Sequence, residues 1–332
     1  MPTTPLLTVS DLRVALNTAR GPADALRGID LQMARGATLG LIGESGSGKS
    51  MTAMAVMRLL PVGARLSGSI VLNGQELVGL SDDAMCAVRG NRIGMIFQEP
   101  MTALNPLHTV GDQIAEPLRL HRGMTRGAAR AEALRLLDRV RLPQAGQRLD
   151  AYPHQLSGGQ RQRVTIAMAL ACGPDLLIAD EPTTALDVTI QGEILALLRE
   201  LVEQSGMALL MISHDLGVMA RMVSELRVMY GGIVVESGPT AEVFGRLAHP
   251  YTRGLFAARP RLGAPRVDGR KPRLATIPGR VPQLLDMPPG CPFADRCAFV
   301  IDACRAALPA PVRVGPGHDA RCIRVGDLGG VA

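Results

Sequence analysis

A glycine-rich loop between an apolar run and a helical pattern is the feature that most constrains this fold. Thr38–Ile42 is apolar enough for a buried strand, residues 43–50 read Gly-Glu-Ser-Gly-Ser-Gly-Lys-Ser, and residues 50–60 have helical spacing that stops at Pro61. In such a strand–loop–helix unit, backbone N–H groups and the helix N-terminus point at phosphate oxygens. The sequence therefore predicts a phosphate-binding loop, and a plain glycine-rich turn is the weaker alternative.

The basic residue of this loop is unusual for this chain. Lys49 and Lys271 are its only lysines, although the chain holds 36 basic residues. A compact ammonium reaches phosphates as a point charge, which a planar guanidinium does not reproduce. We therefore expect Lys49 to contact the outer phosphates and the Ser50 hydroxyl to bind Mg²⁺. The expected nucleotide-binding loop is Gly43, Glu44, Ser45, Gly46, Ser47, Gly48, Lys49, Ser50 and Met51.

Two adjacent carboxylates follow a second apolar run, at residues 176–179. A buried strand there would deliver Asp180 and Glu181 to its carboxyl end. We expect Asp180 to hold Mg²⁺, often through water, and Glu181 to orient or deprotonate an attacking water. The alternative is a simple helix start, which is weaker because a phosphate loop precedes these residues.

A second glycine-rich loop, Leu-Ser-Gly-Gly-Gln at 156–160, lies between these motifs. The combination of 43–50, 156–160 and 176–181 resembles the ABC ATPases. This resemblance implies that the second loop closes on the nucleotide of another subunit, so that the chain is half of a two-site motor. The residues implied to meet that nucleotide are Ser157, Gly158, Gly159 and Gln160.

The resemblance extends to three further residues, in the family's order. It implies that Gln98 senses Mg²⁺ and the γ-phosphate and couples to a membrane partner, and that His214 contacts the γ-phosphate. A loop glutamine and a structural histidine are the plain alternatives. Asp187, in the turn 185–187, matches the loop through which two ATPases sense each other. The implied catalytic set is Lys49, Gln98, Glu181 and His214, the Mg²⁺ ligands are Ser50, Gln98 and Asp180, and the cofactors are ATP and Mg²⁺.

One departure concerns base recognition. Members of this family usually place an aromatic residue upstream of the phosphate loop to stack on adenine, but this chain has no aromatic residue before Phe97. Ala15 or Leu16 would lie near that position and would offer only apolar contact. The prediction that the nucleotide is ATP rather than GTP therefore depends on the resemblance alone, and we expect relaxed selectivity for the base.

Alternating strand and helix patterns indicate an α/β fold with a mainly parallel sheet. The resemblance implies an ABC-type P-loop ATPase domain with a RecA-like core, an antiparallel β subdomain, an inserted helical subdomain and a small Cys-bearing C-terminal extension. The expected domains are 1–245, with the helical subdomain at about 100–170, and 246–332, in which a linker-like stretch at 259–290 leads into a Cys-bearing tail at 291–322. The expected strands are 66–80 as a pair turning at Asn73–Gly74, 93–97, 175–180, 207–213 and the pair 226–237, and the expected helices are 126–140, 160–171 and 188–204.

Several stretches are similar to one branch of the family, the ATP-binding subunits of oligopeptide, dipeptide and nickel importers. They are residues 97–106, 152–157, 179–189, 249–253 and 288–297. The branch implies an ATPase coupled to peptide uptake, with a second ATPase subunit (homologous or identical), two transmembrane permeases and an extracytoplasmic solute-binding protein as partners. Nickel, an opine or a sugar-like solute remains open.

Four cysteines lie close together near the C-terminus, at Cys291, Cys297, Cys304 and Cys322. Four thiolates suffice for one tetrahedral metal or an iron–sulfur cluster, and their spacing is not that of a Cys-x2-Cys zinc ribbon. The family tail implies a 4Fe–4S cluster, while zinc, or four reduced structural thiols, remain alternatives. Cys86 and Cys172 lie outside this group and are expected to be ordinary core or surface residues.

Charge and hydropathy exclude several classes. The net charge of +6 comes mainly from arginine, but no dense arginine run with interleaved aromatics suggests nucleic-acid binding. A soluble ABC ATPase acting on nucleic acid or the ribosome would need a second module, coiled-coil insertions or basic arms, and a redox or metal sensor is a further alternative. No membrane span or signal peptide is evident. We therefore expect a peripheral protein on the cytoplasmic face of the inner membrane.

Overall fold

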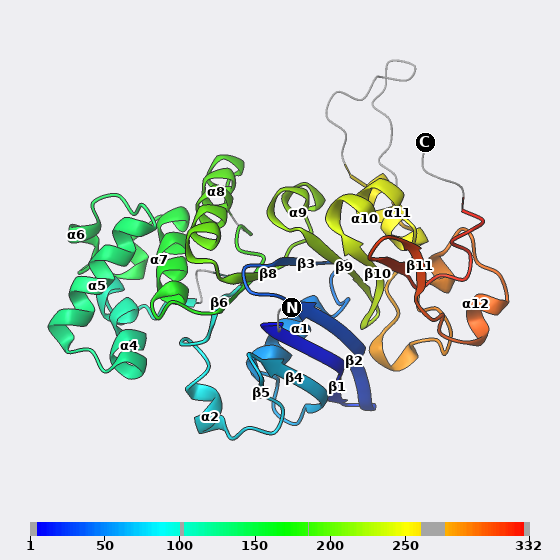
Figure 1. Ribbon diagram of the computed structural model, residues 1–332, viewed down its shortest axis with the longest axis horizontal. Helices are drawn as coiled ribbons and strands as arrows, with labels where there is room; N and C mark the ends of the chain where they lie inside the picture. The colour runs from blue at the N-terminus through cyan, green and yellow to red at the C-terminus, as the bar shows by residue number, and fades with distance from the viewer. Residues whose placement is uncertain (1–4, 100–102, 185, 260–275, 329–332) are drawn as a thin grey trace, which may run out of the picture.

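The computed structural model describes residues 5–99, 103–184, 186–259 and 276–328. Within these residues the chain forms a four-stranded sheet and an eight-stranded main sheet, with a helical group at one end and the C-terminal segment at the other (Figure 1). None of the helices in this part combines the length and apolarity needed to span a bilayer. Some residues named in the predictions from the sequence lie outside the described ranges. They are Pro100, Met101, Thr102, Ala185, Lys271 and part of the linker-like stretch.

The small sheet is antiparallel, in the order β2-β1-β4-β5. Its strands are β1 (Leu7–Thr18), β2 (Gly21–Met33), β4 (Arg65–Leu72) and β5 (Gln75–Glu76). Asn73 and Gly74 both have positive φ, 49° and 83°, as the predicted tight hairpin turn requires. The inward side chains of this sheet share a buried apolar cluster with β3 and α1, so the small sheet and the phosphate loop are packed together.

The main sheet contains a parallel segment in the order β9-β3-β8-β7-β6. Its strands are β3 (Thr38–Ile42), β6 (Ile93–Ile96), β7 (Leu176–Asp180), β8 (Ala208–Ile212) and β9 (Glu225–Tyr230). Strands β7 and β8 are buried at every position, which explains the apolar sequences at 176–179 and 208–212. Because parallel strands end at one edge, the loops after β3, β6, β7 and β8 meet there.

Helices α1 (Lys49–Met57), α8 (Val188–Ser205) and α9 (Leu216–Met222) pack beside this sheet, while the short helix α2 (Asp82–Cys86) lies away from it, near β5 (Figure 1). Helix α1 ends at Met57 rather than at residue 60, because Arg58 adopts a left-handed conformation and its N–H bonds to the carbonyls of Met54 and Ala55. The predicted stop at Pro61 was therefore too late.

The predicted helical insertion lies at one end of the molecule, on the left in Figure 1. It contains α4 (Val110–Arg122), α5 (Arg126–Arg139), α6 (Ala145–Arg148), the 3₁₀ turn η1 (Pro153–Gln155) and α7 (Gly158–Leu170). Thr109 and Thr125 cap α4 and α5 by accepting backbone N–H groups. Helix α7 packs against β6, α4 and α5, so it links the insertion to the main sheet.

The C-terminal segment continues the main sheet. Strand β10 (Ile233–Pro239) pairs antiparallel with β9 and with β12 (His318–Ala320), which in turn pairs with β11 (Val312–Gly315). The remaining elements are α10 (Thr240–Arg246), α11 (Pro250–Ala257), η2 (Leu284–Asp286), η3 (Ala294–Arg296) and α12 (Ala303–Ala306). The expected domain boundary at 245/246 falls inside α10, and the two strands of the extension were not predicted.

Candidate active site

The phosphate loop leaves the end of β3 and begins α1, as its sequence predicts. Gly43 has φ +153°, and a Cβ there would lie 2.2 Å from the Met229 carbonyl oxygen. Gly48 has φ +105°, and its Cβ would lie 2.8 Å from a methyl carbon of Leu26. Side chains are therefore excluded by both conformation and space, and the backbone stays open for a ligand.

Lys49 is only 7% exposed and is folded back onto the loop. Its Nζ donates to the carbonyl oxygens of Gly43, at 2.8 Å, and Glu44, at 3.0 Å. Burial lowers the pKa of Lys49, while the carboxylates of Glu181, Asp180 and Glu44 act in the opposite direction. A phosphate group would supply the compensating charge that this buried ammonium needs.

Asp180 and Ser50 lie together, as a Mg²⁺ site would require. The Ser50 hydroxyl hydrogen bonds the Asp180 carboxylate, and Oδ1 of Asp180 is buried without a partner. Burial raises the pKa of Asp180, opposed by the Ser50 hydrogen bond and the Lys49 charge. An orphaned carboxylate oxygen beside a hydroxyl is the kind of oxygen donor set that Mg²⁺ prefers, so these residues fit the ion.

Glu181 is the centre of a polar cluster at the carboxyl edge of the sheet. Its carboxylate accepts from Gln98 Nε2 at 3.4 Å and from Thr184 Oγ1 at 2.9 Å, and it lies 3.3 Å from His214 Nδ1. Its backbone has φ 47°, an uncommon conformation for a side chain larger than glycine. The structure therefore brings together Gln98, Glu181 and His214, and adds Thr184, which was not predicted.

The second glycine-rich loop forms the N-terminus of α7. Ser157 Oγ accepts the Gln160 N–H, and Gln160 Oε1 accepts the Ser157 N–H, which is a capping box. Asp187 caps α8 by accepting the Ile190 N–H at 3.0 Å. Together these residues line an open hollow of about 500 Å³, to which none of the described phosphate-loop residues contributes. The second glycine-rich loop and the phosphate loop of one chain thus lie at separate surface sites.

The region of the expected base contact is apolar. Ala15 and Leu16, near the end of β1, are both half-buried. Both side chains are aliphatic, and relaxed base selectivity stays a prediction.

The four C-terminal cysteines surround one apolar cavity, shared with Phe293 and Pro309. All six cysteines of the chain fall in described residues and are free thiols. In the described part of the chain, no three His, Cys, Asp or Glu side chains are close enough to hold a metal ion. Burial raises the pKa of Cys291 to about 11, and the three other thiols add to this effect. Four ionised thiolates would therefore need a cation between them.

The sequence did not reveal that the extension contacts the phosphate loop. The Glu44 N–H donates to the Tyr251 hydroxyl at 2.6 Å, and the Glu44 carboxylate is paired with Arg296. Tyr251 lies in the stretch 249–253 and Arg296 in the stretch 288–297, both singled out for their resemblance to importer subunits. Their contact with Glu44 joins positions more than 200 residues apart, a separation that no local sequence pattern spans.

Comparisons with known proteins identify the family. Residues 26–184 match the family model described as ABC transporter, and residues 235–304 match the model described as oligopeptide/dipeptide transporter, C-terminal region. A putative peptide import ATP-binding protein of Brucella melitensis is 52% identical over 96% of this chain and 97% of its own length. The oligopeptide transport ATP-binding protein OppD of Salmonella typhimurium is 46% identical, over 97% of this chain and 95% of its own length.

Solved structures agree with this assignment. The dimeric ATP-binding cassette MJ0796, in a post-hydrolysis state with ADP and Pi, has a TM-score of 0.64 and 30% identity, covering 70% of this chain and 98% of the cassette. The cassette fold expected from the sequence and the resemblance on which it depended are thus confirmed. The chain belongs to the ABC transporter family, in its group of peptide-import ATP-binding proteins.

Proposed function

We propose that this chain hydrolyses ATP to drive import of dipeptides or oligopeptides through a membrane transporter. The observation that carries this proposal is the convergence of Gln98, Glu181 and His214 on one sheet edge, beside the buried Lys49. The peptide as solute is supported by the similarity along the whole chain, including the C-terminal region.

The site supports hydrolysis by positioning and charge. Lys49 and the backbone N–H groups of the loop bind the phosphates, and Glu181 orients the attacking water and accepts its proton. Gln98 contacts one oxygen of the Glu181 carboxylate and His214 contacts the other, and these contacts orient the carboxylate. Mg²⁺ bound by Ser50, Gln98 and Asp180 would neutralise phosphate charge.

We propose that a second ATPase subunit completes each nucleotide site. Ser157, Gly158, Gly159 and Gln160 line a hollow that is separate from the chain's own phosphate loop, and Asp187 lies beside them. The N-terminus of α7 offers a partial positive charge to a phosphate that another subunit binds. The dimeric arrangement of the similar cassette MJ0796 supports this assembly.

We propose that the permeases dock beside Gln98. A mainly apolar groove of about 300 Å³ lies between β6 and α7, lined by Met95, Phe97 and Met168 among others. Phe97 is 42% exposed there although it is a large apolar side chain. A permease segment in this groove would touch the loop that holds Gln98 and so sense the nucleotide. Two permeases and an external solute-binding protein would place the chain on the cytoplasmic face of the membrane.

We propose that the extension from residue 246 onward holds a 4Fe–4S cluster. Four free thiols around one apolar cavity supply the ligand number and the dry surroundings that such clusters use. Cys291, Cys297, Cys304 and Cys322 would be its ligands, while the ATPase domain comprises residues 1–245 with its helical subdomain at about 100–170.

The test is the Glu181→Gln variant, purified with ATP from the membranes of its own host. The variant should bind MgATP normally and lose about 10²–10⁴-fold in turnover, because the general base is gone. Glu203→Gln, an exposed residue of α8, is the matched control and should keep wild-type turnover. Normal ATPase activity in Glu181→Gln would contradict the assigned site.

Mass spectrometry of the same preparation tests the assembly. Two permeases and a second ATPase should co-purify, and the reconstituted complex should take up labelled dipeptides in an ATP-dependent manner. Recovery with ribosomes or nucleic acid, or transport of nickel but not peptide, would overturn the proposed role while leaving the ATPase assignment.

A further inference from the structure

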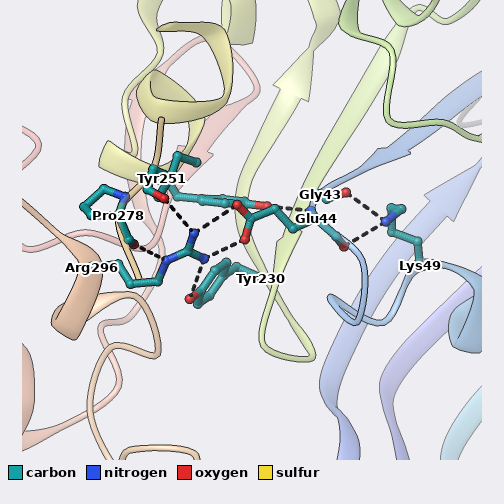
Figure 2. A network of polar contacts seen from close by, with 8 residues as sticks. Gly43, Glu44, Lys49, Tyr230, Tyr251, Pro278 and Arg296 are labelled. Atoms are coloured by element: carbon teal, nitrogen blue, oxygen red, sulfur yellow. Dashed lines mark hydrogen bonds and ion pairs between the residues drawn. The ribbon is translucent and has the colours of Figure 1, made fainter. Parts of the chain in front are cut away.

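One arginine of the C-terminal extension holds the phosphate loop from outside the ATPase core. Arg296 Nη1 donates to Glu44 Oε2 at 2.5 Å, and Nη2 donates to Glu44 Oε1 at 3.1 Å (Figure 2). This is a bidentate pair, the geometry in which a guanidinium binds a carboxylate most strongly. Glu44 is the second residue of the phosphate loop, so the pair joins the extension directly to the nucleotide site.

Every N–H group of this guanidinium has a partner. Besides the two bonds to Glu44, Nη1 donates to the Tyr230 hydroxyl at 3.2 Å, Nε to the Pro278 carbonyl at 2.8 Å, and Nη2 to the Ile277 carbonyl at 3.4 Å. These five bonds use all five donors of an arginine. The Arg296 side chain is 6% exposed and that of Glu44 is 28% exposed, so the guanidinium is shielded from solvent and fixed in orientation, while the carboxylate is partly buried.

The backbone of Glu44 is held at the same place. Its N–H donates to the Tyr251 hydroxyl, and its carbonyl accepts from Lys49 Nζ (Figure 2). The Tyr251 ring packs edge-on against Tyr230, which also receives the Arg296 bond. Glu44 is thus positioned through its carboxylate, its N–H and its carbonyl, and the last of these contacts also sets the position of Lys49.

The charge of Glu44 needs this partner. A carboxylate in a loop that binds phosphates repels them, and the repulsion is strong where water is excluded. Arg296 neutralises that charge from the side of the extension, opposite Lys49 in Figure 2. A buried ion pair adds little to the stability of the folded protein by itself. Attaching the extension to the ATPase core would therefore not require an acidic residue in the phosphate loop.

We propose that Arg296 is a positioning residue for ATP binding: it fixes Glu44 and cancels its charge, so that the extension sets the nucleotide affinity of the phosphate loop. The proposal rests on the proposed ATPase function. Arg296 is the last residue of the turn η3 and directly precedes Cys297, so this short segment carries both a member of the cysteine group and the contact with the nucleotide site.

The test compares four variants of the full-length chain by titration calorimetry with MgADP, and by KM for ATP in the assembled transporter. Arg296→Met leaves Glu44 uncompensated and should raise the Kd and the KM about tenfold, the loss typical of one charged hydrogen-bond partner. The kcat at saturating ATP should change less than about twofold, because the groups around Glu181 are untouched. Arg296→Lys restores the charge but not the bidentate geometry, and should recover part of the affinity.

The decisive comparison is the double variant Arg296→Met/Glu44→Gln. Removing the uncompensated carboxylate should restore affinity relative to Arg296→Met, whereas a merely structural arginine would not be rescued by changing Glu44. Arg305→Met is the matched control, because Arg305 lies in the same extension, is half exposed and pairs with Asp295. It should bind MgADP as the wild type does.

The outcomes separate this inference from the function on which it rests. Wild-type affinity in both Arg296→Met and Arg296→Lys overturns the inference, as does a double variant no tighter than Arg296→Met. If Arg296→Met does not fold, Arg296→Lys, which keeps the charge and fills the buried space, tests the bidentate geometry alone, and a wild-type Kd for MgADP then overturns the inference. A wild-type chain that binds no nucleotide would instead refute the proposed function.

Discussion

A buried histidine makes the stability of this protein pH-dependent. His249 is 1% exposed and caps α11: its Nδ1 accepts the Tyr251 N–H at 3.1 Å. Its own backbone N–H donates to the buried Glu236 carboxylate at 2.9 Å. Burial lowers the pKa of His249 to about 4, although the Glu236 charge and a backbone hydrogen bond with Arg321 act in the opposite direction. The folded protein therefore holds this imidazole neutral.

The direction in which the unfolding free energy changes with pH follows from proton uptake. The unfolded chain has the ordinary histidine pKa of about 6.5, so between that value and about 4 it binds more protons than the folded chain. The contribution of His249 is fully present above pH 6.5 and is lost as the pH falls toward 4. A shift of about 2.5 pKa units corresponds to about 3.4 kcal/mol in total, of which about 2 kcal/mol is lost by pH 5.

The perturbation that isolates this effect is His249→Asn. Asparagine is a good N-cap and its side-chain oxygen can accept the Tyr251 N–H, but it does not titrate. Urea unfolding followed by far-UV circular dichroism at pH 7.5 and pH 5 gives the change in unfolding free energy for each protein. We expect the wild type to lose about 2 kcal/mol more than the variant over this interval. Any destabilisation of the variant that is the same at both pH values cancels when the two changes are subtracted.

His108→Asn provides the control, because His108 is exposed on the helical insertion. It should show the pH dependence of the wild type. If His249→Asn also keeps the wild-type pH dependence, the histidine is not held neutral by burial, and the reasoning from its environment is wrong.

Two further changes test the phosphate loop and the cysteine group. Gly43→Ala places a Cβ 2.2 Å from the Met229 carbonyl oxygen and should abolish MgADP binding in calorimetry. The control Gly74→Ala, at positive φ in open space, should cost about 1 kcal/mol of stability and leave MgADP binding intact. Normal MgADP binding by Gly43→Ala would contradict the loop geometry. Cys297→Ser should lower the iron per chain in anaerobically purified protein, measured by plasma mass spectrometry and visible absorption, while Cys86→Ser should not; a wild-type chain without iron would refute the cluster.

The polar cluster at the sheet edge was predictable because it depends on two local rules. Buried parallel strands have continuous apolar sequences, and the residue after each strand lies at the shared carboxyl edge. Glu181 was placed at the end of such a strand by this rule, and Gln98 and His214 also follow closely on one. The roles of Gln98 and His214 came from the resemblance to the ABC ATPases. Ser157 and Asp187 were predicted to act between two subunits, and their capping roles, which fit local patterns, were not predicted.

The role of the extension was not predictable because its contacts are long-range. Residues 276–328 contain little regular periodicity, and the short strands β11 and β12 form only because β10 offers an open edge to pair with. The contacts of Tyr251 and Arg296 with Glu44 span 207 and 252 residues. Nothing in the local sequence of either residue distinguishes a partner of the phosphate loop from an ordinary buried side chain.

These long-range contacts join the extension to the phosphate loop. The pairing of β12 with β10 and the hydrogen bond between His318 and Glu236 hold the extension against the sheet. They therefore fix the position of the segment from which Arg296 contacts Glu44. A ligand of the cysteine group that shifts the turn η3 would therefore change the affinity for nucleotide. Because coupling between two binding sites is reciprocal, nucleotide binding would change the affinity of the cysteine group for its ligand by the same factor.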